Sequence, residues 1–450
     1  PANPPVPPTV AGGLVARGPL TLGDAVALAY QFQPRLRTSL ETIRQAEGKE
    51  QISFAAFLPV LITDYSLGAY DLDVGGAGVP VSGVPGAPSF SFLPPSGVLP
   101  VNFNAQAGYE FAELKLQWLV CDFGRRNGTY NQAGLAVDIA QLQTDRVYQT
   151  VANQVAVAYY GVLRVRSLRR IADKQVSRAS EDLDVAKKLE RGGVVEREKV
   201  LRAQVALAQA QQAVDQAEEA EGIALAGLNL AIGLNVSSPT TVADTSEIPP
   251  LTKSLEQCLQ SAVFQRREFQ VARRSVQVAQ EGTRVAGADF APRIVAEGSV
   301  FDFEQTNHAG RADLGLGFIR LEWGLFEGGK RVAEMDISNS KVREAMAEAD
   351  SIADNIAFQV NQAFRQAVAA RKGIDHSQPA IEQWLETYRL VVARSRQGDA
   401  TPAELTDAQA SLTRAQQDYA NSVYNYLTAL ANLDYAMGVT GTPASTGRPQ

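Results

Sequence analysis

The chain has 450 residues, enough for two or three compact domains of ordinary size. Its 49 acidic and 42 basic residues leave a mildly negative charge, which argues against a nucleic-acid-binding surface. Two cysteines and two histidines are too few for a disulfide framework or a metal site, so we expect no cofactor. No run approaches the roughly 18 consecutive apolar residues of a membrane-spanning helix. The chain is therefore either soluble or crosses a membrane as a closed β-barrel.

The first 19 residues are rich in Pro and predict an extended segment. Because residue 1 is Pro rather than Met, we expect that a signal peptide has already been removed. Residues 20–56 predict a helix with Thr21 as its cap and an apolar stripe that breaks near Pro34. A first strand follows over about residues 58–74.

The next segment predicts a hairpin with a long loop. Residues 75–100 are rich in Gly and Pro and lack periodicity, as in a surface loop. Over about residues 101–119, apolar and polar residues alternate at first, which predicts a strand with two different faces. In a membrane barrel, the apolar face meets lipid and the polar face lines the lumen. The expected lipid-facing residues are Phe103, Ala105, Ala107, Tyr109 and Phe111, and the expected lumen-facing residues are Asn104, Gln106 and Glu110.

A long helix and a returning helix complete the first half. About residues 124–190 contain no Pro and few glycines, which predicts one helix about 100 Å long. After a short turn, about residues 196–233 predict a helix that returns. Its apolar seam joins large and small residues at spacings of three and four, which is typical of closely packed coiled coils. The seam residues are Val200, Ala203, Leu207, Ala210, Val214 and Ala217.

The second half repeats this order after a linker at residues 235–252. Its predicted helices cover about residues 253–289, 329–395 and 402–437, its strands cover about 292–304 and 312–325, and residues 439–450 form a flexible tail. The last helix has a seam of the same kind, at Leu405, Ala408, Leu412, Ala415, Tyr419, Ser422, Tyr426, Ala429, Leu433 and Ala436. The chain thus contains two copies of one unit, over residues 20–234 and 253–438.

The amino-acid sequences of the two copies can also be aligned directly. LQWLVCDFGRR, which begins at Leu116, matches LEWGLFEGGKR, which begins at Leu321, and the alignment continues without a gap to Gly233 and Gly438. Upstream, at a different offset, FLPVL from Phe57 matches FAPRI. Two strands per copy cannot close a barrel of useful bore, and so long a helix needs neighbours along its whole length. Both shortfalls predict an oligomer.

The element order, the duplicated W…G…R junction and the turn sequences RGGVVEREKVLRAQ and RQGDATPAELTDAQ resemble the TolC-type outer-membrane efflux channels. The resemblance extends from Leu20 to Gly438. It implies a mainly α-helical, internally duplicated subunit that forms a homotrimer. Four strands per subunit imply a twelve-stranded β-barrel in the outer membrane, and the helices imply an α-helical tunnel across the periplasm. Many members carry an acylated Cys at the mature N-terminus, whereas this chain starts PANPPVPP, so lipidation stays open.

The resemblance implies a passive exit duct of a tripartite efflux or type I secretion system. An inner-membrane pump would deliver substrates through a periplasmic adaptor protein, and outer-membrane lipid would surround the barrel. We expect no enzymatic activity, because the sequence offers no nucleophile–base or metal constellation. The alternative is a structural coiled-coil scaffold without a channel, which explains the helices but not the alternating strands.

The resemblance also implies three groups of functional residues. The barrel–tunnel junction comprises Trp118, Gly124, Arg126, Trp323, Gly328 and Arg331. The adaptor-docking tips comprise Gly193, Val194, Val195, Gly398, Asp399, Ala400 and Thr401. The periplasmic gate comprises Glu404 and Asp407, together with Lys199 and Arg202 at the equivalent positions of the first copy.

Each group also has a purely structural explanation, which the sequence alone does not exclude. The tryptophans would be buried core residues, and the glycines would only permit tight turns. Thr401 to Glu404 fits a capping box with Pro at the first helical position. Cys121 and Cys258 lie far apart in the predicted topology, so we expect both thiols to be free.

Overall fold

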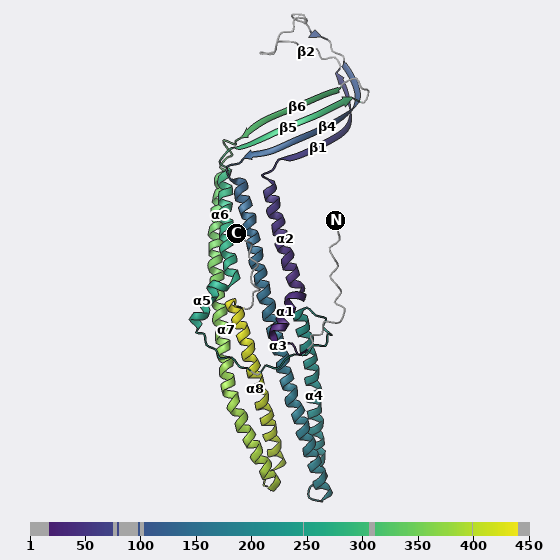
Figure 1. Cartoon of the computed structure of the whole chain (residues 1–450), viewed down its shortest axis with the longest axis vertical. Coiled ribbons are helices and arrows are strands. Elements are labelled where there is room, and N and C mark those ends of the chain that lie inside the picture. Colours follow the sequence, from purple (N-terminus) through teal and green to yellow (C-terminus); the bar gives the residue numbers. More distant parts are fainter. Residues whose placement is uncertain are drawn as a thin grey trace. The chain divides into compact units, whose positions relative to one another are not determined.

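The computed structural model describes residues 18–74, 79–80, 98–99, 103–245, 247–305, 311–397 and 399–439. Figure 1 labels its helices and strands. The chain divides into two compact units, which we describe separately. The sheet unit comprises Gly48–Gly134 and Val278–Val342. The helical unit comprises Pro1–Glu47, Leu135–Gln277 and Arg343–Gln450.

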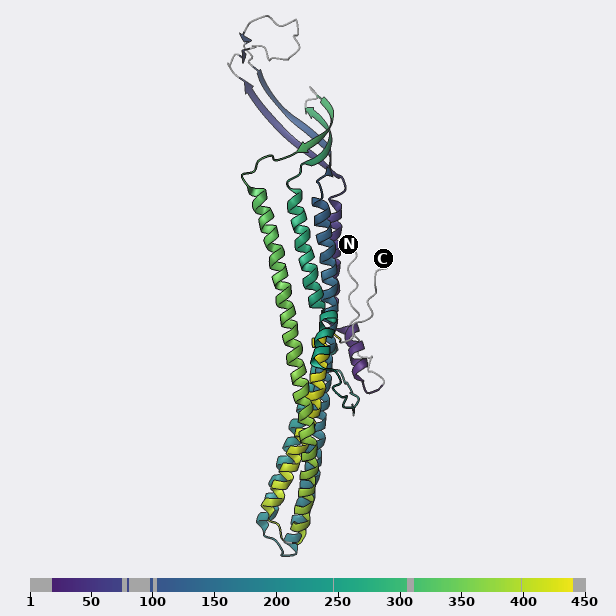
Figure 2. The ribbon, with the colours of Figure 1, turned by 90° about the vertical axis from the view of Figure 1, so that its left-hand side faces the viewer.

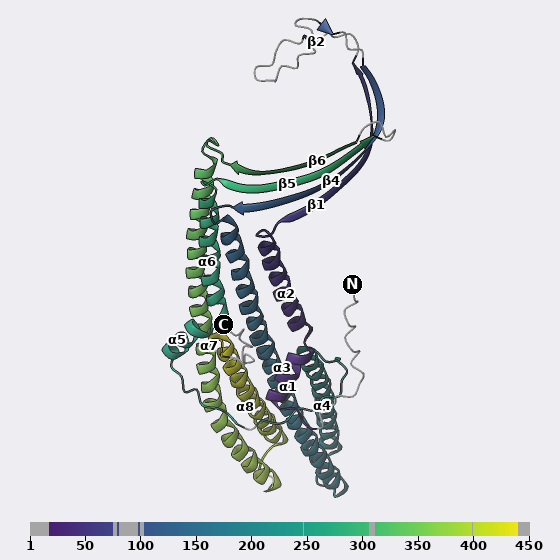
Figure 3. The same cartoon turned by 45° about the horizontal axis from the view of Figure 1, so that its top comes forward.

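The sheet unit contains one four-stranded antiparallel sheet, in the order β1-β4-β5-β6. Figure 3 shows the four strands side by side. Their bounds are Val60–Val74 for β1, Phe103–Cys121 for β4, Arg293–Gln305 for β5 and Arg311–Glu322 for β6. A short pair, β2 (Val79–Pro80) with β3 (Val98–Leu99), lies between β1 and β4 in sequence.

The two hairpins of the sheet pair in the same register. In the first hairpin Val60 lies opposite Gln117, and in the second hairpin Arg293 lies opposite Glu322. These are equivalent positions of the two sequence copies, and the next pairs along each hairpin are equivalent too. The copies therefore fold their strands alike, despite the longer loop in the first hairpin.

Long helices dominate the rest of the chain. α3 (Arg125–Arg191) and α7 (Lys330–Gln397) have 67 and 68 residues, and each is about 100 Å long. α4 (Arg197–Ile232) and α8 (Pro402–Met437) pack against them in the helical unit (Figure 1, Figure 2). Many of the predicted seam residues are buried there: Val200, Ala210, Ala408, Leu412, Ala415, Tyr426, Ala429, Leu433 and Ala436. None of the described helices combines the length and apolarity needed to cross a membrane.

Two predicted helices are interrupted, and the prediction of single helices was wrong there. Residues 20–56 form α1 (Leu22–Phe32) and α2 (Pro34–Ala55), and residues 253–289 form α5 (Leu255–Gln265) and α6 (Arg267–Ala288). The residue at each break, Gln33 or Arg266, has an extended backbone. Pro34 explains the first break, because a residue before Pro avoids the helical conformation.

The ends of the returning helices explain why both breaks occur. α4 ends at Gly233 and α8 ends at Gly438, with φ values of 89° and 76°. A Cβ atom on Gly233 would lie 2.8 Å from the carbonyl oxygen of Phe32, and one on Gly438 would lie 2.9 Å from that of Gln265. Each break thus receives the end of a returning helix at a distance that only Gly allows.

The break residues also bond to the helix ends that they receive. The Gln33 side-chain amide donates to the carbonyl of Ala231 (2.8 Å), and the Arg266 guanidinium donates to that of Ala436 (3.0 Å). The last carbonyls of a helix lack intrahelical partners, so these bonds stabilise the ends of α4 and α8. The second break therefore needs no proline.

Helix caps confirm one further prediction. The Thr21 hydroxyl accepts a hydrogen bond from the backbone N–H of Asp24 (3.2 Å), and the Asp24 carboxylate bonds back to Thr21. Ser254 and Gln257 form the same capping box at α5. The two copies therefore begin with the same kind of cap.

Candidate functional site

The strand pairings divide the sheet side chains between two faces. We call one the apolar face, because its described side chains are mostly apolar and exposed. Leu61 lies opposite Leu116, and Leu114 lies opposite Val300, so these side chains share it. Nine of its large apolar residues are 43–76% exposed: Leu61, Tyr65, Leu67, Leu114, Leu116, Trp118, Val300, Ile319 and Leu321. The same face also carries Asp302 and Asp313, which both pair with Arg311.

The opposite face, which we call the polar face, carries most of the charged side chains of the sheet. The Gln117 amide donates to the Glu297 carboxylate (3.1 Å), and Arg320 pairs with the same carboxylate (2.9 Å). The Glu297 side chain is only 9% exposed, so the three side chains form a partly buried bridge across β4, β5 and β6. The face also carries Asp64, Ser66, Glu113, Lys115 and Ser299. Its apolar side chains include Phe301 and the exposed residues Val60, Ile62, Leu314, Leu316 and Phe318, so the face is mixed rather than uniformly polar.

The continuity of β4 shows which of its residues share a face. Phe111 and Lys115 lie on the same face, because an even number of residues separates them in one strand. Glu110 likewise shares its face with Leu114. Tyr109 and Phe111, expected on the lipid side, therefore share their face with Lys115 and Gln117, because the alternation of apolar and polar residues reverses after Ala112. The side chains of Phe103, Asn104, Ala105, Gln106 and Ala107 lie outside the described part.

Equivalent tryptophans form hydrogen bonds at the open end of each hairpin, away from its loop. The Trp118 indole N–H donates to the carbonyl of Phe57 (3.0 Å), and the Trp323 indole N–H donates to that of Phe290 (3.2 Å). The two residues are 43% and 53% exposed, which excludes the alternative that they are buried core residues. Each indole ties the last strand of its hairpin to the segment that precedes the first strand.

Arg126 connects the end of β4 to the first turn of α3. Its guanidinium pairs with Asp122 (3.1 Å) and donates to the carbonyls of Leu119 (2.6 Å) and Val120 (3.1 Å). It also lies over the Phe57 ring, 4.9 Å from its centroid. The Asp122 side chain is 5% exposed, so this is a nearly buried, multiply bonded ion pair.

Arg331 occupies the equivalent position before α7 and has fewer partners. Its guanidinium pairs with Glu327 at 2.9 Å, and this hydrogen bond lowers the pKa of the Glu327 carboxyl. Left-handed glycines accompany both junctions: Gly124 has φ 104°, and its repeat equivalent Gly329 has φ 85° beside Gly328 at φ 59°. The duplicated motif thus forms the same structure twice: a bend that glycine permits, stabilised by an ion pair between an acidic residue and the Arg four positions later.

The turn between α3 and α4 is tight and exposed. Gly193 has φ 71° and donates its N–H to Glu190 O (2.9 Å), and Val194 N–H donates to Leu189 O (2.9 Å). Val194 is 71% exposed, whereas Val195 is half-buried. The glycine is therefore needed for the turn itself, and Val194 presents an apolar side chain to solvent.

The turn between α7 and α8 confirms the predicted capping box. Glu404 N–H donates to the Thr401 hydroxyl (3.3 Å), and Thr401 N–H donates to the Glu404 carboxylate (2.8 Å). Asp399 N–H donates to Arg394 O (3.0 Å), and Ala400 is half-buried. Gly398 lies outside the described residues.

The predicted gate residues do not meet within one chain. Glu404 and Asp407 are exposed one turn apart on α8, and Arg202 pairs with Glu198 on α4. In the described part of the chain, no ion pair joins Lys199 or Arg202 to either acidic residue.

These features agree with what comparison with known proteins shows. Residues 25–234 and 258–439 match the family described as outer membrane efflux protein. The chain belongs to this family. As a member, it is an exit duct in the outer membrane and extends into the periplasm.

Individual relatives of this efflux protein are distant. It is 25% identical to protein CyaE of Bordetella pertussis, over 75% of this chain and 72% of CyaE. It is 22% identical to the alkaline protease secretion protein AprF of Pseudomonas aeruginosa, over 93% of this chain and 85% of AprF. The crystal structure of the outer membrane protein VceC of Vibrio cholerae shares its fold, with a TM-score of 0.72, 17% identity, and coverage of 93% of this chain and 96% of VceC.

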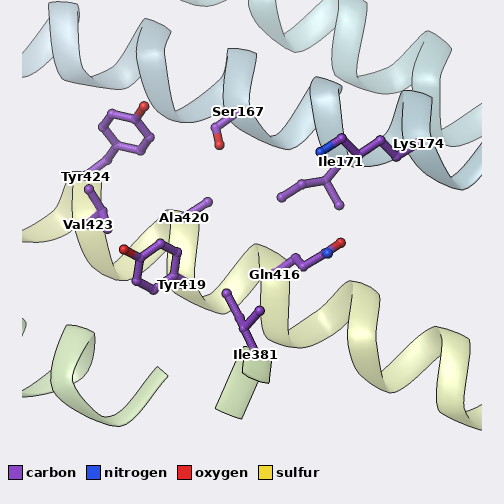
Figure 4. Close-up of a pocket in the computed structure, with 9 residues that line it drawn as sticks. All are labelled: Ser167, Ile171, Lys174, Ile381, Gln416, Tyr419, Ala420, Val423 and Tyr424. Carbon is purple, nitrogen blue, oxygen red and sulfur yellow. The ribbon is translucent and has the colours of Figure 1, made fainter. Parts of the chain in front are cut away.

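Two features of the efflux protein were not predicted from its sequence. The ion pairs of Asp122 and Glu327 with the junction arginines were not predicted, although the equal spacing of four residues in both copies was a usable signal. A groove of about 280 Å³ in the helical unit was also unforeseen (Figure 4). Its lining comes from α3, α7 and α8: Ser167, Ile171, Lys174, Ile381, Gln416, Tyr419, Ala420, Val423 and Tyr424. Tyr419, predicted only as a seam residue, faces this groove.

Both cysteines are free thiols, as predicted. Among the described residues, no three His, Cys, Asp or Glu side chains gather at metal-binding distance.

Proposed function

We propose that three copies of this chain close a twelve-stranded barrel in the outer membrane, with four strands from each copy. The observation that carries this proposal is the difference between the two faces of the sheet. A barrel wall needs apolar side chains toward lipid and polar side chains toward a water-filled lumen. The exposed apolar face fits the lipid side, and the face with Gln117, Glu297 and Arg320 fits the lumen.

The long helices would continue the duct as an α-helical tunnel. Each copy supplies two helix pairs, α3 with α4 and α7 with α8, whose seams bury large and small residues alternately. Such seams let helices approach closely along their length. Six pairs from three copies would then form the tunnel wall. Passive conduction through it requires no catalytic group.

Type I secretion is the use of the duct that the relatives favour. The name of AprF refers to secretion of an alkaline protease, and the similarity to AprF covers 93% of this chain. We therefore propose that an inner-membrane pump and a periplasmic adaptor deliver a protein substrate to the duct. Small-molecule efflux is the second candidate, favoured by the family that matches the chain.

The exposed turns would be the adaptor-docking tips. Val194 is highly exposed at the α3–α4 turn, and Asp399 and Thr401 are exposed at the α7–α8 turn. An apolar side chain held at a rigid turn is a suitable contact for a partner, because little conformational freedom is lost on binding. The same tips would carry the gate, where Glu404 and Asp407 of three copies form two rings of carboxylates.

Deletion of the gene in its native host tests the secretion function. We expect one or more secreted proteins to disappear from the culture medium and to return when the gene is restored, with unchanged sensitivity to antibiotics and dyes. Unchanged secretion combined with increased drug sensitivity would instead establish small-molecule efflux. A protein recovered in the soluble periplasmic fraction, with neither effect, would favour the scaffold alternative.

A further inference from the structure

A groove of about 420 Å³ lies on the apolar face of the sheet. Three glycines line it: Gly298 of β5, and Gly315 and Gly317 of β6. Gly298 lies directly opposite Gly317 in the strand pairing. Ser299 and Leu316 also line the groove, although their side chains belong to the opposite face, so the floor of the groove is strand backbone. We call this groove the glycine trough.

Apolar side chains form the walls of the glycine trough. They are 45–64% exposed, and they are Leu61 of β1, Leu114 and Leu116 of β4, and Val300 of β5. The backbone of β5 is paired on both sides, with β4 and with β6. An apolar ligand on this floor therefore leaves no N–H or C=O group of β5 without a partner.

The packing of the chain itself does not require glycine at these three positions. A Cβ atom on Gly317 would meet no atom within 4 Å, and one on Gly298 or Gly315 would make ordinary contacts at 3.8 Å and 4.0 Å. None of the three has a left-handed backbone, and the β5–β6 pairing contains no bulge. Glycine inside a strand weakens it, and without a bulge it marks a place where another group approaches the backbone closely.

The first hairpin fills the equivalent place with its own side chains. In the sequence repeat, the equivalents of Gly298, Gly317 and Gly315 are Tyr65, Ala112 and Glu110. The Tyr65 hydroxyl donates to the Glu110 carboxylate (3.2 Å), so these two side chains span the place that the second hairpin leaves open. Strands of the same register thus accept side chains here, and a need for sheet curvature does not explain the glycines.

We propose that the glycine trough holds an acyl chain of lipopolysaccharide, the lipid of the outer leaflet. The proposal rests on the barrel proposed above, in which the apolar face meets lipid, and it names one lipid and its place on that face. An acyl chain is thin and unbranched, so it can lie directly on a backbone floor that glycine leaves bare. The apolar walls then bury its sides.

Charged residues at one end of the trough indicate where the polar head of the lipid lies. Asp302 lies opposite Asp313, one row beyond Val300 toward the β5–β6 loop. Arg311 pairs with these two carboxylates at 3.1 Å and 3.5 Å. The buried Oδ1 atom of Asp302 has no hydrogen-bond partner among the described residues. A phosphorylated sugar head offers hydroxyl donors to this oxygen and phosphate to Arg311.

The position of this charged row selects the leaflet. The β5–β6 loop lies at the end of the sheet away from α6 and α7, which precede β5 and follow β6. The helices of this family member extend into the periplasm, so the loop end faces outward. A phospholipid of the inner leaflet would have its head at the opposite end of the trough, where the apolar residues Ile319 and Leu321 continue the face.

Binding of purified rough-type lipopolysaccharide to the detergent-solubilised trimer, counted by native mass spectrometry, tests the proposal. The unaltered trimer should bind three molecules most tightly, one for each trough. Gly317→Leu fills the floor without a clash, so the affinity should fall about tenfold. Ala112→Leu is the matched control, because it lies on the same face at the equivalent position of the first hairpin, and its affinity should be unchanged. Neither variant should lower the melting temperature in detergent, since Leu suits a strand at least as well as Gly or Ala.

Three results would overturn the proposed site. The first is equal affinity of the Gly317→Leu and Ala112→Leu variants. The second is a Gly317→Leu chain that fails to assemble, because the fold itself would then require this glycine. The third is binding of phosphatidylethanolamine with acyl chains of the same length as tightly as lipopolysaccharide, which would refute the assignment to the outer leaflet.

Failure of the proposed barrel gives a different result. Ile319→Cys, in a chain that also carries Cys121→Ser and Cys258→Ala, places a nitroxide label beside the trough on the apolar face. In vesicles this label should respond to oxygen dissolved in the lipid. A response to a water-soluble relaxation agent instead would show that the apolar face does not meet lipid, and would refute the barrel orientation on which the site rests.

Discussion

Gly438 and Gly233 show how a single residue decides the packing of the helical unit. Each ends a returning helix in a left-handed conformation and lies directly against the backbone of a helix break. A side chain at either position would be strained by the left-handed backbone and would clash with the helix break. Both positions therefore require Gly more strictly than a glycine in an exposed turn does. The same short approach occurs in both copies of the repeat.

Gly438→Ala should therefore destabilise the protein markedly. The Cβ atom would lie 2.9 Å from Gln265 backbone atoms, and the left-handed backbone adds strain, so we expect a loss of about 1–3 kcal/mol. Gly227→Ala in α4 is the matched control, because a Cβ atom there meets no atom within 4 Å. The melting temperature in detergent should fall for Gly438→Ala and stay level or rise for Gly227→Ala. Equal melting temperatures for the two variants would contradict this packing.

Asp434 provides a prediction about pH. Burial raises the pKa of its carboxyl, and the opposing influence of Lys253 is smaller. A carboxyl with a raised folded-state pKa is penalised when ionised, so the penalty is present at neutral pH and disappears as pH falls below the unfolded-state pKa. Asp434→Asn should therefore raise the melting temperature at pH 7, with a gain that shrinks toward pH 4. Exposed Asp418→Asn serves as the control, and a lower melting temperature for Asp434→Asn at pH 7 would count against the burial argument.

At the scale of elements, the sheet shows which features can be predicted from the alternation of apolar and polar residues. Alternation identified β4 correctly as a strand, because the period of two is a property of the extended backbone. It does not fix which face meets lipid, since Glu110 and Leu114 share one face while Phe111 and Lys115 share the other. The neighbouring strands settle the faces, and their pairing cannot be derived from the alternation of one strand alone.

Neighbouring residues of β4 test the assignment of the faces. Leu116 lies on the apolar face and Gln117 on the polar face, where it bonds to Glu297. An Arg that faces lipid costs up to about 2–4 kcal/mol at the middle of the membrane and less toward its edges, whereas an Arg that faces the lumen is hydrated. Leu116→Arg should thus reduce the amount of assembled trimer in outer membranes much more than Gln117→Arg. The opposite order would place lipid on the polar face.

The helix breaks mark another limit of prediction from sequence. Pro34 predicts the first break, but no Pro or other helix-breaking residue predicts the second break, at Arg266. It arises from tertiary contacts with the end of α8, which only the folded chain supplies. By contrast, the capping boxes at Thr21 and Thr401 were predictable, because all their partners lie within one helical turn.

At the scale of the whole molecule, the proposed function depends on three copies acting together. Among the described residues of one chain, β1 and β6 each pair with one strand only, and no ion pair joins Glu404 or Asp407 to Lys199 or Arg202. The order and length of the elements were predictable, because each strand, helix and turn pattern occurs in both copies of the repeat and each copy supports the prediction for the other. Glu404 and Asp407, which we propose act only in an assembly, could be named from the family resemblance, but their partners in the assembly could not be predicted.

Neutralising the acidic rings tests the gate. Glu404→Gln retains the capping bond to Thr401, because a Gln side chain also accepts that hydrogen bond. Combined with Asp407→Asn, it should weaken the preference for cations over anions, most clearly at low salt. Reversal potentials across planar bilayers measure this preference. If selectivity is unchanged, Glu404 acts only as a helix cap.

The central claim is that this chain forms a continuous water-filled channel, and conductance measures it most directly. Purified protein of trimeric mass, inserted into planar lipid bilayers, should give discrete ionic current steps of uniform size. The Glu404→Gln, Asp407→Asn variant should give steps of altered size or selectivity, because its substitutions lie at the narrowest point of the proposed path. A trimer that inserts into bilayers and carries no current in either form would contradict the claim.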